Sequence, residues 1–137
     1  MLIIVDSSVW ISFFNDGATP QVKRLSRLLD FERESIVVVP VIVFETLSGF
    51  RDDRSFLRGR DVMLDVPMLD ADATTHAEAA ALYRSLRKRG VTVRSPIDCL
   101  IAQTCIEADA RLLTEDRDFD AIAASSALKL VDPRADG

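Results

Sequence analysis

Residues 2–14 read LIIVDSSVWISFF, and this stretch decides the expected fold. The apolar, β-branched run Leu2–Val5 predicts a buried strand. The residues that follow predict a short helix from Ser8 to Phe14, with Ser7 as its N-cap. Asp6 therefore stands at the carboxyl end of the first strand, where the helix begins.

The same alternation of strand and helix recurs four or five times, which is typical of an α/β domain with a parallel sheet. Further strands are expected at 36–39, 110–113 and 128–131, with a short edge strand at 66–69. Helices are expected at 20–34, 40–49, 52–63, 72–89, 95–106 and 118–123.

The length of 137 residues, 48% of them hydrophobic, suits one sizeable core. We expect a single domain over 1–137, with a frayed tail from about Pro133 to Gly137. No signal-peptide pattern and no apolar run of about 20 residues is present, so we expect a soluble, cytoplasmic protein without a membrane segment. Cys99 and Cys105 would lie about 9 Å apart on one helix, too far for a disulfide.

The net charge of −5 argues against a protein that coats nucleic acid through a basic surface. That argument weakens if the excess carboxylates gather at one metal site while arginines cluster elsewhere. Two basic stretches, within 51–60 and 84–94, allow this arrangement, although each could be an ordinary solvated face.

Four acidic residues fall near the ends of predicted strands. Asp6 and Asp116 follow strands directly, Asp98 lies in the first turn of a helix, and Glu45 lies in the helix after the second strand. The carboxyl ends of parallel strands meet at one edge, so at least three of these side chains should converge. Taken singly, each has a structural alternative: a helix cap, a capping-box partner of Ser95, or a turn residue.

Carboxylates that share a crevice repel one another unless a cation compensates. Mg²⁺ or Mn²⁺ prefers such oxygen ligands and can activate water for attack on a phosphodiester, which is nuclease chemistry. The single histidine, His76, excludes a ribonuclease with a histidine pair. Ser7 and Ser8 lack a histidine partner, and no glycine-rich phosphate loop occurs.

The acidic residues lie within motifs that resemble those of PIN-domain VapC toxins. These motifs are Val5-Asp6-Ser7-Ser8-Val9-Trp10-Ile11, Phe44-Glu45-Thr46-Leu47, Ser95-Pro96-Ile97-Asp98-Cys99-Leu100-Ile101-Ala102 and Leu112-Leu113-Thr114-Glu115-Asp116-Arg117-Asp118-Phe119. They follow the family's order and span nearly the whole chain.

The resemblance implies a three-layer α/β/α fold and a Mg²⁺- or Mn²⁺-dependent endoribonuclease. It also implies a homodimer that is inhibited by a small VapB-type antitoxin, with DNA bound only through that antitoxin. In the family, the catalytic acids match Asp6, Glu45, Asp98 and Asp116, of which Asp6, Asp98 and Asp116 hold the metal. Ser7 and Thr114 match supporting polar positions, and Asp118 either joins the metal network or caps the following helix.

Two other functions remain open. A non-catalytic PIN-like module would bind RNA or protein without needing a metal. A phosphatase or phosphoacceptor also places an aspartate after its first strand, but it requires a second one where Ser8 stands, or a nearby lysine.

Aromatic residues exceed what one small core readily uses, so some should be exposed for partners. They are Trp10, Phe13, Phe14, Phe31, Phe50 and Phe56. We expect the helices around Leu25–Phe31 and Phe50–Leu57 to form a groove for an apolar antitoxin helix. A basic residue of the antitoxin tail would then reach the carboxylates.

Overall fold

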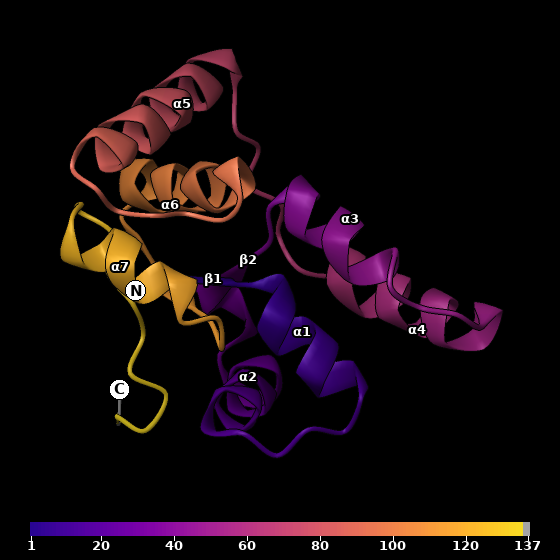
Figure 1. Cartoon of the computed structure of the whole chain (residues 1–137). Helices are drawn as coiled ribbons and strands as arrows, with labels where there is room; N and C mark the ends of the chain where they lie inside the picture. The colour runs from indigo at the N-terminus through magenta and orange to yellow at the C-terminus, as the bar shows by residue number, and fades with distance from the viewer. Residues whose placement is uncertain (136–137) are drawn as a thin grey trace.

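A parallel three-stranded sheet forms the centre of the computed structural model, which describes residues 1–135 (Figure 1). The strand order is β2-β1-β3, with β1 (Leu2–Val5) between β2 (Ile36–Val37) and β3 (Ala110–Leu113). Ile3 pairs with Ile36 on one side and with Arg111 on the other. The central position buries Ile3, Ile4 and Val5 on both faces, which explains why β1 is a continuous apolar run.

β3 spans the predicted residues 110–113, whereas the other outer segments pair over fewer residues than the sequence predicted. The predicted strand 36–39 pairs with β1 only at Ile36 and Val37, because Pro40 opens a helix directly afterwards. The expected strands at 66–69 and 128–131 are reduced to isolated bridges, Val38 to Met68 and Leu112 to Leu130. These bridges still extend the parallel order at both edges.

Seven α-helices surround the sheet within the described residues. They are α1 (Ser7–Phe14), α2 (Pro20–Phe31), α3 (Pro40–Leu47), α4 (Asp53–Leu64), α5 (Ala73–Lys88), α6 (Pro96–Ala108) and α7 (Asp118–Ala124). A 3-10 turn, Arg33–Ser35, follows α2, so the expected helix over 20–34 ends early. The side chains of Thr19, Asp52, Asp72 and Ser95 cap α2, α4, α5 and α6 as local sequence signals suggest.

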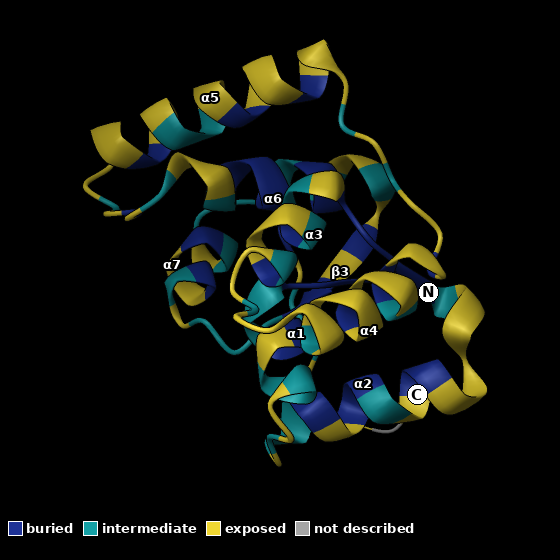
Figure 2. Ribbon diagram, turned by 90° about the vertical axis from the view of Figure 1, so that its right-hand side faces the viewer, coloured by how far each residue is buried: buried dark blue, intermediate teal, exposed yellow. Residues whose placement is uncertain are grey.

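The helices form layers on either side of the strands, as the resemblance implies (Figure 1). Helices α1 and α2 lie on one side, and α6 packs against β3 on the other, with α5 covering α6. Helices α3 and α4 pack on each other and project to the right of the view. In Figure 2, α6 is mostly buried, whereas α5 shows an exposed outer face.

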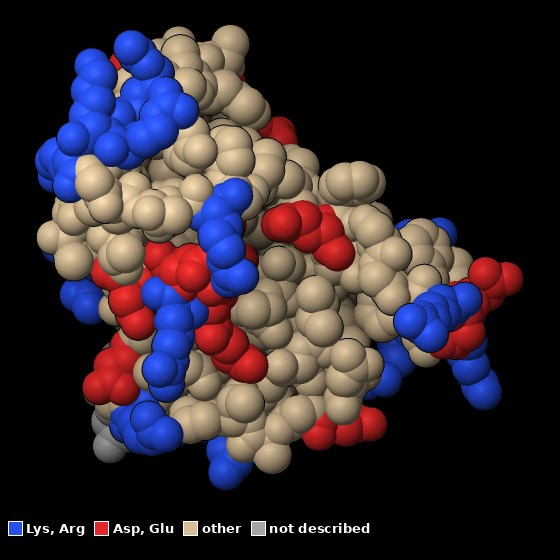
Figure 3. Space-filling model, viewed as in Figure 1, with Lys and Arg blue, Asp and Glu red and all other residues tan. Residues whose placement is uncertain are grey.

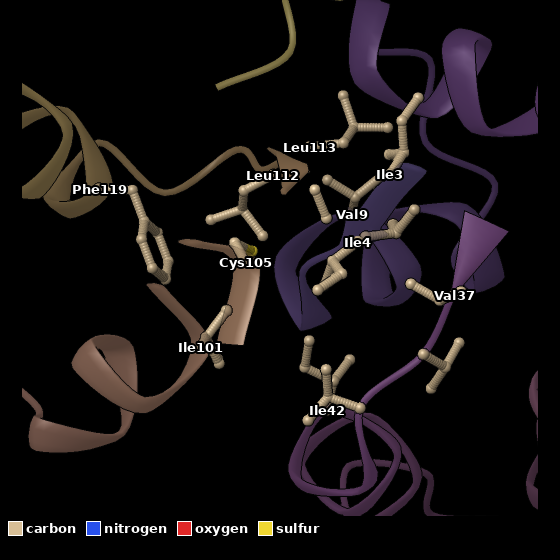
Figure 4. Packing of buried hydrophobic residues seen from close by; sticks show 14 of the residues in the cluster. Ile3, Ile4, Val9, Val37, Ile42, Ile101, Cys105, Leu112, Leu113 and Phe119 are labelled. Carbon is tan, nitrogen blue, oxygen red and sulfur yellow. The ribbon is translucent and has the colours of Figure 1, made fainter. Parts of the chain in front are cut away.

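The core joins both layers across the sheet. Figure 4 shows Ile101 and Cys105 of α6 beside Leu112 of β3, with Ile4 of β1 nearby. All four of these side chains are at most 1% exposed. Burial of one such aliphatic side chain is worth about 1.5–3 kcal/mol, so these contacts stabilise the position of β1 and the acid at its end.

Both cysteines are free and buried, as their spacing predicted. No helix of residues 1–135 is long and apolar enough to cross a membrane. The predicted frayed tail begins at Pro133, where the structure has a turn, while Asp136 and Gly137 lie outside the described residues.

Of the apolar residues within 25–31 that were expected to line the antitoxin groove, Phe31 is 80% exposed and the leucines are buried, so the groove itself stays a prediction. Leu25 and Leu28 are 0% and 1% exposed because they pack into the core from α2. Trp10 is also fully buried and stacks on Phe14 at 5.9 Å between ring centroids. The exposed apolar residues outside α2 include a group on α3 and α4: Phe44, Phe56, Leu57 and Leu64.

Candidate metal centre

Asp6 is the deepest carboxylate of the site. It directly follows β1 and is 4% exposed. Its Oδ2 accepts hydrogen bonds from the hydroxyls of Ser8, at 2.7 Å, and Thr114, at 2.9 Å. Burial raises the pKa of Asp6, while these hydrogen bonds oppose the rise by stabilising the charged form. The two hydroxyls therefore hold this carboxylate in one orientation.

Ser8, rather than the predicted Ser7, is the serine whose side chain supports Asp6. Ser7 is the first residue of α1 and contributes a backbone hydrogen bond to Asp6. Ser7 does not cap α1, because Asp6 occupies the N-cap position. The Asp6 side chain makes no capping bond either. Thr114, the other supporting position that the resemblance implies, donates its hydroxyl to Asp6.

Three further carboxylates gather beside Asp6. The side chains of Asp98, Asp116 and Asp118 each place one oxygen within 4.8 Å of the other two, and we call these three residues the acidic cluster. Asp98 comes from the first turn of α6, Asp116 from the loop after β3, and Asp118 from the start of α7. With Asp6 included, three segments far apart in sequence thus meet at one end of the sheet: residue 6, residue 98 and residues 116–118.

Of the local roles that the sequence left open, the structure shows the turn role of Asp116. The Asp6 side chain makes no capping bond, and among the described residues no hydrogen bond joins the Asp98 side chain to Ser95. The Asp118 backbone N–H donates to Asp116 Oδ1 at 2.9 Å, so Asp116 also stabilises the turn into α7. The Ser95 hydroxyl caps α6 by accepting from the Ile97 N–H, and the Asp98 N–H donates to the Ser95 carbonyl. These bonds fix the backbone and leave the carboxylates turned toward one another.

The charges of Asp6, Glu45, Asp116 and Asp118 all act on Asp98. Desolvation, followed by the charges of Asp116, Asp6, Glu45 and Asp118, raises the pKa of Asp98 to about 7. The pKa of Glu45 is raised by partial desolvation and then by the charge of Asp6, although the residue is open to solvent on α3. The four predicted catalytic acids therefore share one site.

Glu115 is a structural residue of the site that sequence reasoning missed. Its carboxylate accepts hydrogen bonds from the hydroxyls of Ser12, at 2.9 Å, and Thr19, at 2.8 Å, while its backbone N–H donates to Ser8 Oγ. These bonds tie α1 and the start of α2 to the loop that carries Asp116. Its adjacency to Asp116 was the available sequence signal.

One basic side chain forms an ion pair with the acidic cluster among residues 1–135. Arg94 Nε lies 2.6 Å from Asp118 Oδ2. The sequence assigned Arg94 to a basic stretch with residues of α5, whose charges gather on the end of that helix (Figure 3). In the same view, acidic atoms form a patch between α6 and α7, with basic atoms against it.

The residues present fit a hard divalent cation. The close donors are carboxylate oxygens, which Mg²⁺ and Mn²⁺ prefer. Cys99 is next to Asp98, but burial raises the pKa of its thiol to about 11, so it does not offer a thiolate. Desolvation and then the mutual repulsion of the carboxylates raise the Asp98 pKa, and a bound cation would relieve that repulsion.

The chain is similar to proteins of one family by sequence and by fold. The PIN domain family matches residues 3–125. Ribonuclease VapC11 of Mycobacterium tuberculosis and VapC ribonuclease Mb1587 of Mycobacterium bovis are each 37% identical to it, over 89% of this chain and 92% of the relative.

Solved structures share the fold at lower sequence identity. The structure of VapBC2 from Rickettsia felis, bound to a DNA fragment from its promoter, has 19% identity, a TM-score of 0.75 and coverage of 96% of this chain and 98% of that chain. The structure of VapC20 of Mycobacterium tuberculosis, described as a sarcin-ricin loop cleaving toxin, has 18% identity and a TM-score of 0.67. The match covers 87% of this chain and 93% of that chain. The chain therefore belongs to the PIN domain family.

Proposed function

We propose that this chain is a Mg²⁺- or Mn²⁺-dependent endoribonuclease, the toxin of a VapBC-type toxin–antitoxin pair. The observation that carries the proposal is the convergence of Asp6, Glu45 and the acidic cluster, from four places in the sequence, at the carboxyl end of one sheet. The VapC ribonucleases at 37% identity supply the substrate class, RNA.

Each acid has a distinct role in this proposal. Asp6, Asp98 and Asp116 hold the cation, and hydrogen bonds from Ser8 and Thr114 keep Asp6 oriented toward it. A bound cation would lower the pKa of a coordinated water and neutralise charge on the phosphoryl oxygens. Glu45, whose pKa is raised by partial desolvation and then by the charge of Asp6, takes the proton of the attacking water on its carboxylate.

The other candidate chemistries have weaker support. His76 is exposed on α5, and its Nδ1 contacts the Asp72 carbonyl at 2.7 Å, in the first turn of its own helix. Ser8, which occupies the position that a phosphoacceptor site would give to an aspartate, donates its hydroxyl to Asp6. The non-catalytic module remains the second candidate, and it differs by binding RNA in the presence of a chelator.

We further propose that residues 1–137 act as one domain in the cytoplasm and form a homodimer. A small VapB-type antitoxin covers the exposed apolar residues of α3 and α4 and carries any contact with DNA. The solved VapBC complexes, including those bound to DNA, support these partners. Phe56 and Leu57, 38% and 44% exposed, belong to the part of the predicted groove at residues 50–57.

The direct test is cleavage of cellular RNA by purified protein, with sequencing of new 5′ ends. We expect cleavage with Mn²⁺, none with excess chelator, and at least a hundredfold loss in Asp98→Asn, which is about 2.7 kcal/mol in activation free energy. Asp109→Asn is the matched control, because it makes the same change at the exposed other end of α6. Cleavage by Asp98→Asn at the rate of Asp109→Asn would refute the proposal.

A further inference from the structure

Arg94 is held beside the acidic cluster by its backbone and by its side chain. Its neighbour Val93 is buried in the core at 7% exposure, and its other neighbour, Ser95, caps α6. Its Nε donates to Asp118 Oδ2 at 2.6 Å. The base of the side chain and one edge of the guanidinium are therefore both fixed.

The other edge of the guanidinium is free to bind a ligand. The ion pair with Asp118 uses Nε, and no described residue accepts a hydrogen bond from Nη1 or Nη2. The Arg94 side chain is 75% exposed, whereas that of Asp118 is 27% exposed. A planar guanidinium with free N–H groups matches the oxygens of a phosphate.

A site with this many carboxylates requires a basic group if it is to bind a phosphate. Asp6, Glu45 and the acidic cluster together repel a phosphodiester, and a cation compensates only part of their charge. Arg94 forms the one ion pair between this site and a basic side chain among the described residues. The other two ion pairs, Arg33 with Asp65 and Arg60 with Asp61, join residues of other segments.

We propose that Arg94, oriented by Asp118, binds a phosphate of the RNA strand beside the acidic cluster. This inference rests on the proposed ribonuclease function and assigns Asp118 to positioning the arginine through Oδ2. Phosphate contacts fix the register of a nucleic acid without reading its sequence. Arg94 therefore contributes to affinity for all RNA substrates and not to the choice of cleavage site.

The test measures RNA binding in the Asp98→Asn background, where cleavage is blocked. The probe is a labelled twelve-nucleotide oligouridine, titrated at several salt concentrations. We expect Arg94→Ala to weaken binding about tenfold and to reduce the slope of log affinity against log salt by about 0.7, the value for one phosphate contact on a single strand. Arg94→Lys keeps the positive charge but lacks the planar guanidinium, so its oligouridine affinity should lie between those of the Arg94 and Arg94→Ala proteins.

Arg33→Ala is the matched control, because it removes an arginine from an exposed ion pair with an aspartate that is not part of the acidic cluster. We expect it to leave the oligouridine affinity and the salt slope unchanged. Asp118→Asn should weaken binding about threefold, because Arg94 keeps its charge but loses its orientation. Unchanged affinity and slope in Arg94→Ala, or equal losses in Arg33→Ala, would overturn the proposal.

Two further measurements separate this role from metal binding and from catalysis. In protein that retains Asp98, Arg94→Ala should bind Mn²⁺ at least as tightly as the unsubstituted chain, since a competing cation is gone. It should raise KM about tenfold and change kcat less than threefold. A fall in kcat with constant KM would contradict phosphate binding, whereas an unsubstituted chain that binds oligouridine but never cleaves RNA would instead refute the ribonuclease function.

Discussion

Two opposing influences act on Asp98. Its place in the first turn of α6 favours a negative charge, by about 0.3–1 kcal/mol at an exposed site. Desolvation and four neighbouring carboxylates oppose that charge and raise its pKa to about 7. One pKa unit corresponds to about 1.4 kcal/mol, so desolvation and the neighbouring acids together outweigh the helix dipole. The metal-free protein therefore retains a proton that a cation would displace.

This competition predicts a pH dependence of stability in chelator. Between about pH 4 and pH 7 the folded protein retains a proton on Asp98 that the unfolded chain releases, so the free energy of unfolding should fall as pH rises. The slope from Asp98 is at most about 1.4 kcal/mol per pH unit. Urea unfolding should give a flatter profile for Asp98→Asn and an unchanged one for Asp109→Asn. A stability that rises across this range in the unsubstituted chain would contradict the account.

Thr114 provides a second test at the residue scale. Thr114→Val keeps the shape of the side chain but removes the hydroxyl that donates to Asp6 and accepts from the Asp116 N–H. Loss of a group that orients a metal ligand typically costs 10–100-fold in metal affinity, so we expect about that loss for Mn²⁺ by calorimetry. Thr114→Ser keeps the hydroxyl and should retain most of the affinity. Equal affinities for the two variants would remove Thr114 from its assigned role.

The sequence located the acids but not the serine that supports them. Ser7 and Ser8 are adjacent, and consecutive residues on a helix point about 100° apart. The local pattern made Ser7 an N-cap, and the resemblance alone made it a supporting residue, whereas in the structure α1 begins at Ser7 and the Ser8 hydroxyl donates to Asp6. A match to a motif does not decide which of two adjacent hydroxyls faces the carboxylate.

At the scale of elements, Glu115 links the helices on one side of the sheet to the loop after β3. Its contacts with Ser12 and Thr19 span the end of α1 and the cap of α2. Thr19 donates to Glu115 while its hydroxyl also accepts from the Val22 N–H. The loop that carries Asp116 is thus braced by two helices.

Glu115→Ala should lower both stability and activity. It leaves the hydroxyls of Ser12 and Thr19 without their acceptor, and hydrogen bonds to charged groups contribute about 1.5–3 kcal/mol each when well shielded. Since these side chains are only partly buried, we expect a loss of about 1–3 kcal/mol in urea unfolding. Glu34→Ala, an exposed glutamate on the 3-10 turn, is the control. Equal stability of the two variants would show that the brace contributes little.

Helix positions were more predictable than strand lengths. The starts of α2, α4, α5 and α6 follow capping side chains that act within three residues, so the sequence contains the signal locally. A strand requires a partner, and the edge segments around Met68 and Leu130 find one for a single bridge each. Apolar runs predict the existence of these segments but not the length of their pairing.

At the scale of the whole molecule, the acidic site lies apart from the exposed apolar residues of α4 (Figure 1). Acidic atoms form a patch between α6 and α7, while basic atoms gather at the end of α5 (Figure 3). The net charge of −5 therefore does not exclude an RNA substrate, because the excess carboxylates include those of the site. The exposed apolar residues of α3 and α4 lie on the arm to the right of the same view.

This separation predicts that antitoxin binding and RNA cleavage can be disrupted independently. Phe56→Asp on α4 should weaken capture of the cognate antitoxin, co-expressed and co-purified, by at least tenfold while leaving cleavage intact. Phe31→Asp is the control, since Phe31 is 80% exposed at the end of α2. If Phe31→Asp weakens capture and Phe56→Asp does not, the antitoxin surface lies on α2 instead.

The partner surface was the feature least accessible from sequence. An aromatic count gives the excess of apolar area but not its location, and Trp10, Leu25 and Leu28 proved to be core residues. Phe50 packs its ring 5.5 Å from that of Phe14 and close to Gly59, so it is also partly internal. Only the packing of α1 to α4 decides which apolar residues remain outside.

The central claim, that Asp6, Asp98 and Asp116 hold a divalent cation, is tested most directly by calorimetric titration of Mn²⁺ into the metal-free protein. We predict a saturable site in the unsubstituted chain and in Asp109→Asn, with stabilisation approaching about 2.7 kcal/mol at a hundredfold excess over Kd. Asp98→Asn should lose that site while remaining folded. The absence of saturable Mn²⁺ binding in the unsubstituted chain, or equal binding in Asp98→Asn, would contradict the account.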